Sequence, residues 1–157
     1  MTAGPPLGTH TAMTPQKTFP LPPIAVIGCG LGRPCLTRAA AACLDAAAVV
    51  VGGKRLLAAF PDHPGRRIPI SGPLAGVLDA IEAARQAGQS VAVLADGDGL
   101  YFGIGATLLA RFGREALAFY PNVTTVALAC SRLGRPWHAL TAVSLHGRSD
   151  MTPLFAA

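Results

Sequence analysis

The sequence predicts an α/β domain with a mostly parallel five-stranded sheet, helices on its faces and the start of a second α/β domain. Short apolar runs alternate along the chain with helical segments, and the two clearest runs each end in a glycine loop. Such alternation is typical of βαβ units around a parallel sheet. Open sheets of this class bind ligands at their carboxyl edge, and glycine lets the main chain approach a ligand. We therefore expect the loop after residue 95 to contact its ligand through main-chain atoms.

Each expected element has its own signal. The first and fourth strands are uninterrupted apolar runs, as buried parallel strands require. The helix that opens at Pro73 carries apolar residues at positions 74, 77, 78 and 81, along one face. In chain order, we expect strands near 24–28, 47–51, 67–70, 90–95 and 116–120, with helices near 35–45, 53–59, 73–87, 102–112 and 124–133. A sixth strand near 140–145 would begin the second domain.

The chain divides into three predicted regions. Residues 1–23 hold six of the fourteen prolines and almost no charge, so we expect a disordered leader. Residues 24–122 would form the first domain, and residues 123–157 a linker helix with the first strand of an incomplete second domain. No apolar run reaches the roughly eighteen residues of a membrane span. No basic start with a following apolar stretch marks a secretory signal, so the expected location is the cytoplasm.

The two glycine loops do not fit a nicotinamide-binding site. That site needs Gly-x-Gly-x-x-Gly, with an acidic residue about twenty positions later. In the first loop, Gly28-Cys-Gly-Leu-Gly32, the third glycine comes one position early. The second strand is followed by Gly52-Gly-Lys-Arg55, which offers no carboxylate. The dinucleotide pattern therefore fails at two independent points.

Three loops in order carry a different resemblance: Gly28-Cys-Gly-Leu-Gly32, Gly97-Asp-Gly-Leu-Tyr-Phe-Gly103 and Pro121-Asn-Val-Thr-Thr125. They resemble the tetrapyrrole methylase family, whose pattern is Gly-x-Gly-Pro-Gly, then Gly-Asp-Pro-x-x-(Phe/Tyr)-Gly, then Pro-Gly-(Val/Ile)-(Ser/Thr)-(Ser/Ala). The segments 49–57, 128–138 and 143–148 look like the precorrin-6Y (or cobalt-precorrin-7) methyltransferase branch. That branch methylates carbon 5 of a corrin precursor.

The resemblance implies an S-adenosylmethionine-dependent methyltransferase of cobalamin biosynthesis, acting on a precorrin at carbon 5 or at carbons 5 and 15. Carried over by position, the cofactor-binding residues are Leu31, Asp96, Gly97, Asp98, Tyr101, Thr124 and Thr125. A positive cleft suits a substrate with many carboxylates. Lys54, Arg55 and Arg148 follow strand ends and are the candidate substrate-binding residues. His146, after the sixth strand, is the candidate for substrate contact or proton removal.

Several of these residues have a second interpretation. The threonines can cap the helix that follows them instead of binding a cofactor. Asp96 and Asp98 have the spacing of an acid/base pair or a metal site, but the sequence identifies no further ligands, so we expect no metal. We favour Asp98 as a loop-ordering or cofactor contact, and Asp96 as a replacement for a small residue of the family.

The chain departs from the family pattern at three positions. Leu31 and Gly99 replace prolines, which predicts more mobile loops because proline stiffens the backbone. Asn122 replaces a glycine, and we expect a mild change because asparagine tolerates a left-handed turn. The family continues with most of a second domain, whereas this sequence stops at Ala157. Two functions stay open: a methyltransferase or its front portion, and a non-catalytic α/β module that folds or dimerises without turnover.

The charge and amino-acid composition limit the classes of partner that we expect the chain to bind. Basic residues give a formal net charge of +5 but are scattered, whereas a nucleic-acid-binding protein would concentrate them. The chain is 51% hydrophobic and 13% charged, so we expect a second domain or a second copy to cover part of its surface. The four cysteines lack paired spacing, which argues against disulfides and zinc. Cys29 is expected as a small residue in a crowded turn, and Cys43 and Cys130 as core residues.

Overall fold

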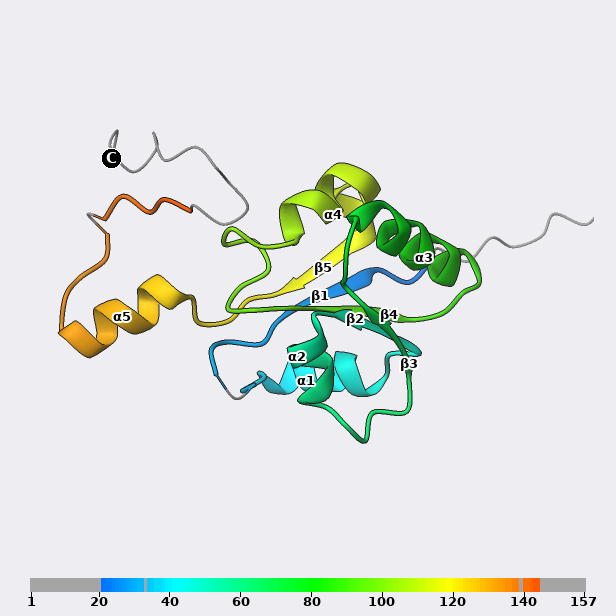
Figure 1. Ribbon diagram of the computed structural model, residues 1–157, viewed down its shortest axis with the longest axis horizontal. Coiled ribbons are helices and arrows are strands. Elements are labelled where there is room, and N and C mark those ends of the chain that lie inside the picture. Colours follow the sequence, from blue (N-terminus) through cyan, green and yellow to red (C-terminus); the bar gives the residue numbers. More distant parts are fainter. Residues whose placement is uncertain (1–20, 33, 139, 145–157) are drawn as a thin grey trace, which may run out of the picture.

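A computed structural model describes residues 21–32, 34–138 and 140–144 of the chain. Five strands form one sheet in the order β3-β2-β4-β1-β5 (Figure 1). All neighbouring strands pair in parallel, which confirms the predicted fold class. The strands are β1 (Ile24–Gly28), β2 (Val49–Gly52), β3 (Arg66–Pro69), β4 (Val91–Ala95) and β5 (Leu117–Tyr120).

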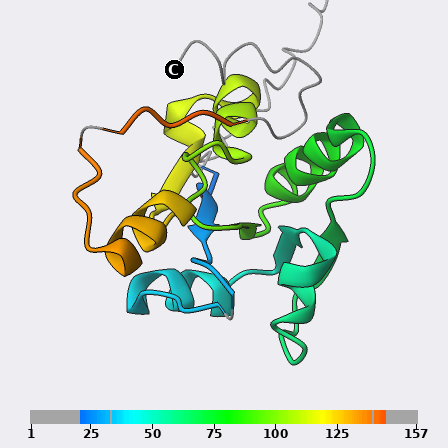
Figure 2. The same ribbon diagram turned by 60° about the vertical axis from the view of Figure 1, so that its left-hand side comes forward.

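Helices cover both faces of the sheet. α3 and α4 lie on one face and α1 and α2 on the other, while α5 lies beyond the carboxyl ends of the strands, away from these layers (Figures 1 and 2). A 3₁₀ turn leads from α4 into β5. The helical elements are α1 (Arg38–Asp45), α2 (Lys54–Ala58), α3 (Leu74–Gln86), α4 (Gly105–Phe112), η1 (Arg114–Ala116) and α5 (Thr125–Leu133).

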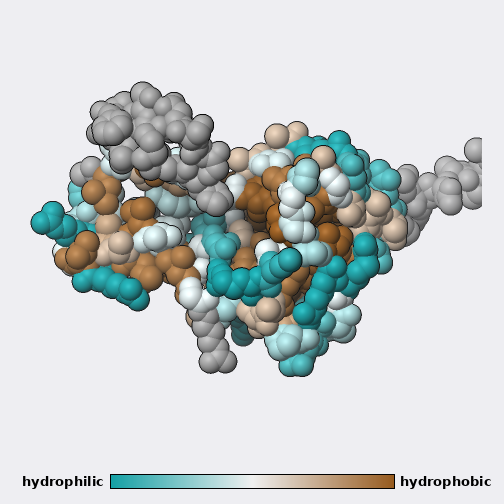
Figure 3. Space-filling view, in the orientation of Figure 1, coloured by the Kyte–Doolittle hydropathy of each residue, from teal (hydrophilic) through white to brown (hydrophobic). Residues whose placement is uncertain are grey.

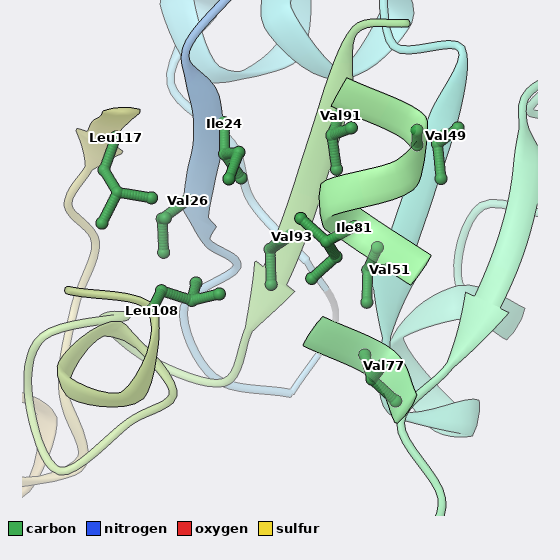
Figure 4. Close-up of a cluster of buried hydrophobic side chains, with 11 residues drawn as sticks. Ile24, Val26, Val49, Val51, Val77, Ile81, Val91, Val93, Leu108 and Leu117 are labelled. Atoms are coloured by element: carbon green, nitrogen blue, oxygen red, sulfur yellow. The ribbon is translucent and has the colours of Figure 1, made fainter. Parts of the chain in front are cut away.

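Alternation along the strands builds two cores, because successive side chains of a strand point to opposite faces. In β1, Ile24 and Val26 face α3 and α4, whereas Ala25 and Ile27 face α1 and α2. The cores are apolar: no polar or charged residue is buried among the described residues. Figure 4 shows the first core, whose labelled side chains are Ile24, Val26, Val49, Val51, Val77, Ile81, Val91, Val93, Leu108 and Leu117.

Most expected elements are present, with shifted ends. α1 begins at Arg38 and not near residue 35, because the Thr37 hydroxyl accepts a hydrogen bond from the Ala40 N–H and so caps the helix there. The sixth strand is a wrong prediction over its described part, since residues 140–144 form no strand. A strand needs a hydrogen-bonding neighbour, and no described strand pairs with this segment. Residues 1–20 of the expected leader lie outside the described residues.

The structure also bears on membranes. Within the described ranges, none of the helices combines the length and apolar character that crossing a bilayer would require.

Replacing Leu108 tests the core between α4 and the sheet. The Leu108 side chain is 0% exposed, so Leu108→Ala leaves a cavity and should lower the free energy of unfolding by about 2–5 kcal/mol. The matched control is Leu133→Ala, since Leu133 on α5 is 72% exposed; its cost should stay within about 0.5 kcal/mol. Urea unfolding measures both, and equal costs would contradict the packing described.

Candidate functional site

The connections that follow β1 and β4 leave the sheet on opposite faces. β1 leads to α1 on one face and β4 leads to α4 on the other, although the two strands are neighbours. Open parallel sheets bind ligands outside the carboxyl ends of their strands at such a switch point. Both glycine loops that the sequence singles out lie at this point of the sheet.

Gly30 and Gly97 join the two loops by their main chains. The Gly30 N–H donates to the Gly97 carbonyl over 3.1 Å, and the Gly97 N–H donates to the Gly30 carbonyl over 2.8 Å. Both residues have a positive φ, +67° and +59°, which side-chain-bearing residues rarely adopt. The first loop therefore already uses the Gly97 N–H, and the expected main-chain contact between the second loop and a ligand stays a prediction for its other main-chain atoms.

Asn122 attaches the third motif segment, residues 121–125, to both glycine loops; we call this segment the third turn. Its backbone N–H donates to Asp98 Oδ2 over 3.1 Å. Its side-chain Nδ2 donates to the carbonyls of Gly28 and Cys35, over 2.9 and 2.8 Å. Its Oδ1 accepts from the Val123 N–H over 2.8 Å. The three segments are thus linked to one another by hydrogen bonds.

The predicted reason for Asn122 is wrong. Among the described residues, Phe102 is the one non-glycine residue with a positive φ, so Asn122 makes no left-handed turn. Its carboxamide supplies donors and an acceptor that glycine lacks. The sequence held one signal of this role, because Asn122 is the only asparagine of the chain and stands inside a motif.

The two acidic residues of the second loop have separate partners. Asp98 Oδ1 accepts from the Leu100 N–H over 2.8 Å, so this carboxylate orders the loop and the third turn together. Asp96 is exposed and forms an ion pair with Arg55. Arg55 also donates to the Gly32 carbonyl over 3.3 Å. In the described part of the chain, no group of three or more His, Cys, Asp or Glu residues could hold a metal ion.

Three predicted cofactor-binding residues converge beside the bridge between the loops. A Cβ placed on Gly97 would lie 3.6 Å from the Thr124 Cα and 4.0 Å from Leu31 Cδ2. The Thr124 hydroxyl accepts from the Ala127 N–H over 3.1 Å, so it caps α5. Helix capping, the second interpretation of this residue, is therefore what the structure shows for its hydroxyl.

The other predicted residues are more dispersed. Tyr101 is half-buried and packs edge-on against Phe102, with ring centroids 4.8 Å apart. Thr125 is exposed on the first turn of α5, and Lys54 is exposed at the start of α2. The remaining candidates, His146 and Arg148, lie outside the described residues.

Sequence reasoning missed how tightly Gly99 packs. A Cβ at this position would lie 2.7 Å from Val26 Cγ1, so a larger residue here would require the loop or the Val26 side chain to shift. Beside it, Val26, Asp98, Leu100 and Phe119 line part of a cavity of about 270 Å³. A larger cavity of about 470 Å³ lies between α1 and the α2–β3 connection, and no residue of the glycine loops lines it.

Cys29, Cys43 and Cys130 behave as small core residues, whereas Cys35 is exposed. Cys29 is 2% exposed, and its burial, followed by the nearby Asp96 charge, raises the pKa of its thiol to about 11. A thiol that keeps its proton at neutral pH is a poor nucleophile. Cys130 is buried, and Cys43 packs against the core formed with α1 and α2.

Comparison with known proteins adds sequence and fold relatives. The family model for Tetrapyrrole (Corrin/Porphyrin) Methylases matches residues 23–155. The chain is 37% identical over 126 residues to cobalt-precorrin-7 C(5)-methyltransferase of Salmonella typhimurium, covering 80% of this chain and 62% of the relative. It is 34% identical over 124 residues to the decarboxylating precorrin-6Y C(5,15)-methyltransferase of Mycobacterium tuberculosis, covering 78% of this chain and 31% of the relative.

A solved structure shares the fold. Uroporphyrin-III C-methyl transferase from Thermus thermophilus, complexed with S-adenyl homocysteine, matches with a TM-score of 0.58 and 26% identity. The match covers 80% of this chain and 56% of that one. The chain thus spans less than two thirds of the length of the curated relatives that it matches.

A double-mutant cycle tests the contact between Gly99 and Val26. Gly99→Ala should lower the free energy of unfolding by about 1–3 kcal/mol, because the new Cβ overlaps Val26 Cγ1. In a Val26→Ala background the same change should cost about 1 kcal/mol less, since the overlapping methyl group is gone. Gly76→Ala is the matched control: its Cβ meets open space within α3 and should stabilise by about 0.5–1 kcal/mol. If Gly99→Ala lowers the free energy of unfolding equally in both backgrounds, the contact with Val26 is not the cause of the loss.

The raised pKa of the Cys29 thiol predicts a loss of stability in alkali. Between pH 9 and 11 the folded thiol keeps its proton while the unfolded thiol loses it, so stability falls as pH rises, by up to about 1.4 kcal/mol per pH unit. Cys29→Ala should remove this part of the slope, whereas Cys35→Ala, at an exposed position, should keep it. Urea unfolding at a series of pH values measures how the free energy of unfolding depends on pH. An equal dependence in Cys29→Ala and Cys35→Ala would show that the Cys29 thiol is not responsible.

Proposed function

Because this chain belongs to the tetrapyrrole (corrin/porphyrin) methylase family, we propose that it carries the cofactor-binding half of an S-adenosylmethionine-dependent C-methyltransferase. The substrate is a precorrin of cobalamin biosynthesis, methylated at carbon 5 or at carbons 5 and 15, and the reaction takes place in the cytoplasm. The observation that carries the proposal is the meeting of the three motif loops at the switch point of the sheet.

The residues at this edge suit a cofactor with an apolar and a polar part. A Cβ on Gly97 would contact the Val123 carbonyl oxygen, the Thr124 Cα and Leu31 Cδ2 at 3.5, 3.6 and 4.0 Å, so the bare main chain of Gly97 lies beside these residues. The Leu31 side chain offers an apolar contact there, and the exposed Thr125 offers a hydroxyl that can donate or accept. We assign cofactor binding to these residues together with Asp98 and Tyr101, and to Asp96 at the outer end of the loop.

S-adenosylmethionine supplies a methyl group that is already activated as a sulfonium. The ring carbon of the substrate contributes the electron pair of the new carbon–carbon bond, and the electrons of the broken carbon–sulfur bond stay on sulfur. Such a transfer needs alignment of the two reactants more than a strong acid or base. The contribution of this chain is therefore to fix the loops that hold one reactant opposite the other.

Cationic side chains at the same edge suit the carboxylates of a precorrin. Arg55 is held beside the second loop by Asp96, yet its side chain is 61% exposed and can reach a second carboxylate. Lys54 precedes it on the same helical turn and is also exposed. We assign substrate binding to Lys54, Arg55 and Arg148, and proton removal or substrate contact to His146.

The site needs a second half to enclose it. Beyond the carboxyl edge, hydrophobic side chains gather on and after α5 (Figure 3), where Leu133, Trp137 and Leu140 are 72%, 56% and 55% exposed. We propose that a second domain, of which residues 123–157 are the beginning, or a second copy of the chain covers them. A module that folds or dimerises without turnover is the alternative function.

Calorimetric titration with S-adenosylhomocysteine tests the proposed site. The wild-type chain should bind one equivalent, and Gly97→Val should weaken binding by at least about tenfold because its side chain would stand beside Leu31 and Thr124, where we propose that the cofactor binds. Gly113→Val is the matched control: Gly113 also has a positive φ but precedes β5 at the opposite edge, with no atom near its Cβ position. The Gly113→Val variant should bind S-adenosylhomocysteine with wild-type affinity.

Two outcomes would count against the proposal. If the folded wild-type chain takes up no S-adenosylhomocysteine, the chain by itself has no working cofactor site, and the non-catalytic module is favoured. If both valine variants lose binding alike, the loss reflects backbone strain at a left-handed glycine and not contact with the cofactor.

A further inference from the structure

The carboxamide of Asn122 bridges Gly28 and Cys35, which lie on either side of the first glycine loop in the connection from β1 to α1. The loop leaves β1 at Gly28 and reaches α1 beyond Cys35, and the carbonyls of these two residues accept from the same Nδ2. An amide nitrogen has two N–H groups, so one side chain can satisfy both carbonyls at once. The opposite side of the carboxamide, Oδ1, accepts from the Val123 N–H and so anchors the third turn.

The fit of this side chain depends on the absence of side chains opposite it. A Cβ on Gly28 would lie 3.0 Å from the Asn122 Cβ, and a Cβ on Gly30 would lie 3.2 Å from Asn122 Oδ1. The first loop therefore packs its bare main chain directly against the asparagine. Aspartate has the same shape but would turn acceptor oxygens toward two carbonyls, and glycine or alanine would leave those carbonyls unbonded.

The hydrogen bonds among the three segments form a closed cycle. The first loop joins the second through Gly30 and Gly97, and the second joins the third turn through Asp98 and the Asn122 N–H. The carboxamide then returns from the third turn to the first loop. Each link holds the partners of the next in place, so opening one weakens the others. This matters because Leu31 and Gly99 stand at the two loop positions where the family pattern has prolines, which would stiffen the backbone.

We propose that Asn122 is a positioning residue, whose carboxamide holds the two glycine loops and the third turn in one register at the carboxyl edge. Its effect on cofactor binding rests on the function proposed above, whereas its effect on the loops does not. The two effects can therefore be measured separately on the same variants.

Amide hydrogen exchange of the full chain, followed by NMR, measures the effect on the loops. Asn122→Gly and Asn122→Asp should each speed exchange of the Gly30 and Gly97 amides by at least about tenfold, with aspartate the stronger change. The exchange rate of the Val93 amide, in the middle of β4, should rise only by the amount that the loss of global stability accounts for. Urea unfolding measures that loss. Both variants should still unfold cooperatively.

Ser90→Ala is the matched control. The Ser90 hydroxyl accepts from the Ala48 N–H over 2.9 Å and donates to the Ala46 carbonyl over 2.7 Å, so it also bridges two main-chain groups. It does so at the opposite edge of the sheet, so its removal should leave Gly30 and Gly97 exchange at the wild-type rate.

Three results would overturn the proposal. Unchanged exchange at Gly30 and Gly97 in the Asn122 variants would show that the cycle does not depend on the carboxamide. Equal acceleration in the loops and at Val93, or variants that do not fold, would make Asn122 a residue of general stability. If the Gly30 and Gly97 amides exchange at the wild-type rate in Asn122→Asp but not in Asn122→Gly, hydrogen-bond donation by the Asn122 side chain is not what holds the loops.

A titration with S-adenosylhomocysteine separates the two proposals. If the wild-type chain binds, affinity should fall at least about tenfold in both Asn122 variants and stay unchanged in Ser90→Ala. Equal affinity in wild type and Asn122→Gly would break the link between loop register and cofactor binding. If the wild-type chain does not bind, the proposed function fails while the exchange rates still decide the positioning role.

Discussion

Direct packing of main chain against main chain at the ends of β1 and β4 is the constraint on which the site depends. A Cβ on Gly28 would lie 2.6 Å from the Gly97 carbonyl oxygen, closer than any side-chain carbon approaches an oxygen. Because Gly28 at the end of β1 has no side chain, the loops that follow β1 and β4 can pair through Gly30 and Gly97 before they diverge to opposite faces. The switch point is thereby a fixed platform, on which the third turn and the Arg55–Asp96 pair are assembled.

This arrangement explains why the chain needs so little reactive chemistry at its candidate site. The Cys29 thiol is buried and keeps its proton, and the two loop carboxylates are each engaged by a different partner. What remains is a set of fixed loops with cations at their rim. That inventory fits the methyl transfer proposed above, in which the donor brings its own activation and the protein supplies alignment. Family membership and geometry therefore point the same way.

The elements of the sheet could be predicted from the sequence because their signals are local. The apolar run of β4 and the one-sided periodicity of α3 identify each element without knowledge of its neighbours. The links within the site could not be predicted in this way. Asn122 bonds to Gly28 and Cys35, and Arg55 pairs with Asp96, across long stretches of sequence whose approach depends on strand order. A motif can place these residues at the same edge, but only the fold brings particular atoms together.

Strand order also dictates when the sheet can form as the chain emerges from the ribosome. β1 is made first but lies between β4 and β5: Ala25 pairs with Ala92, and Ile24 pairs with Leu117. Until those later strands exist, the apolar β1 has neither of its hydrogen-bonding neighbours. Contacts this distant in sequence slow folding, and an unpaired apolar strand is prone to associate with other chains meanwhile. The segment that delivers the first glycine loop is thus the one that nascent-chain chaperones have most reason to shield.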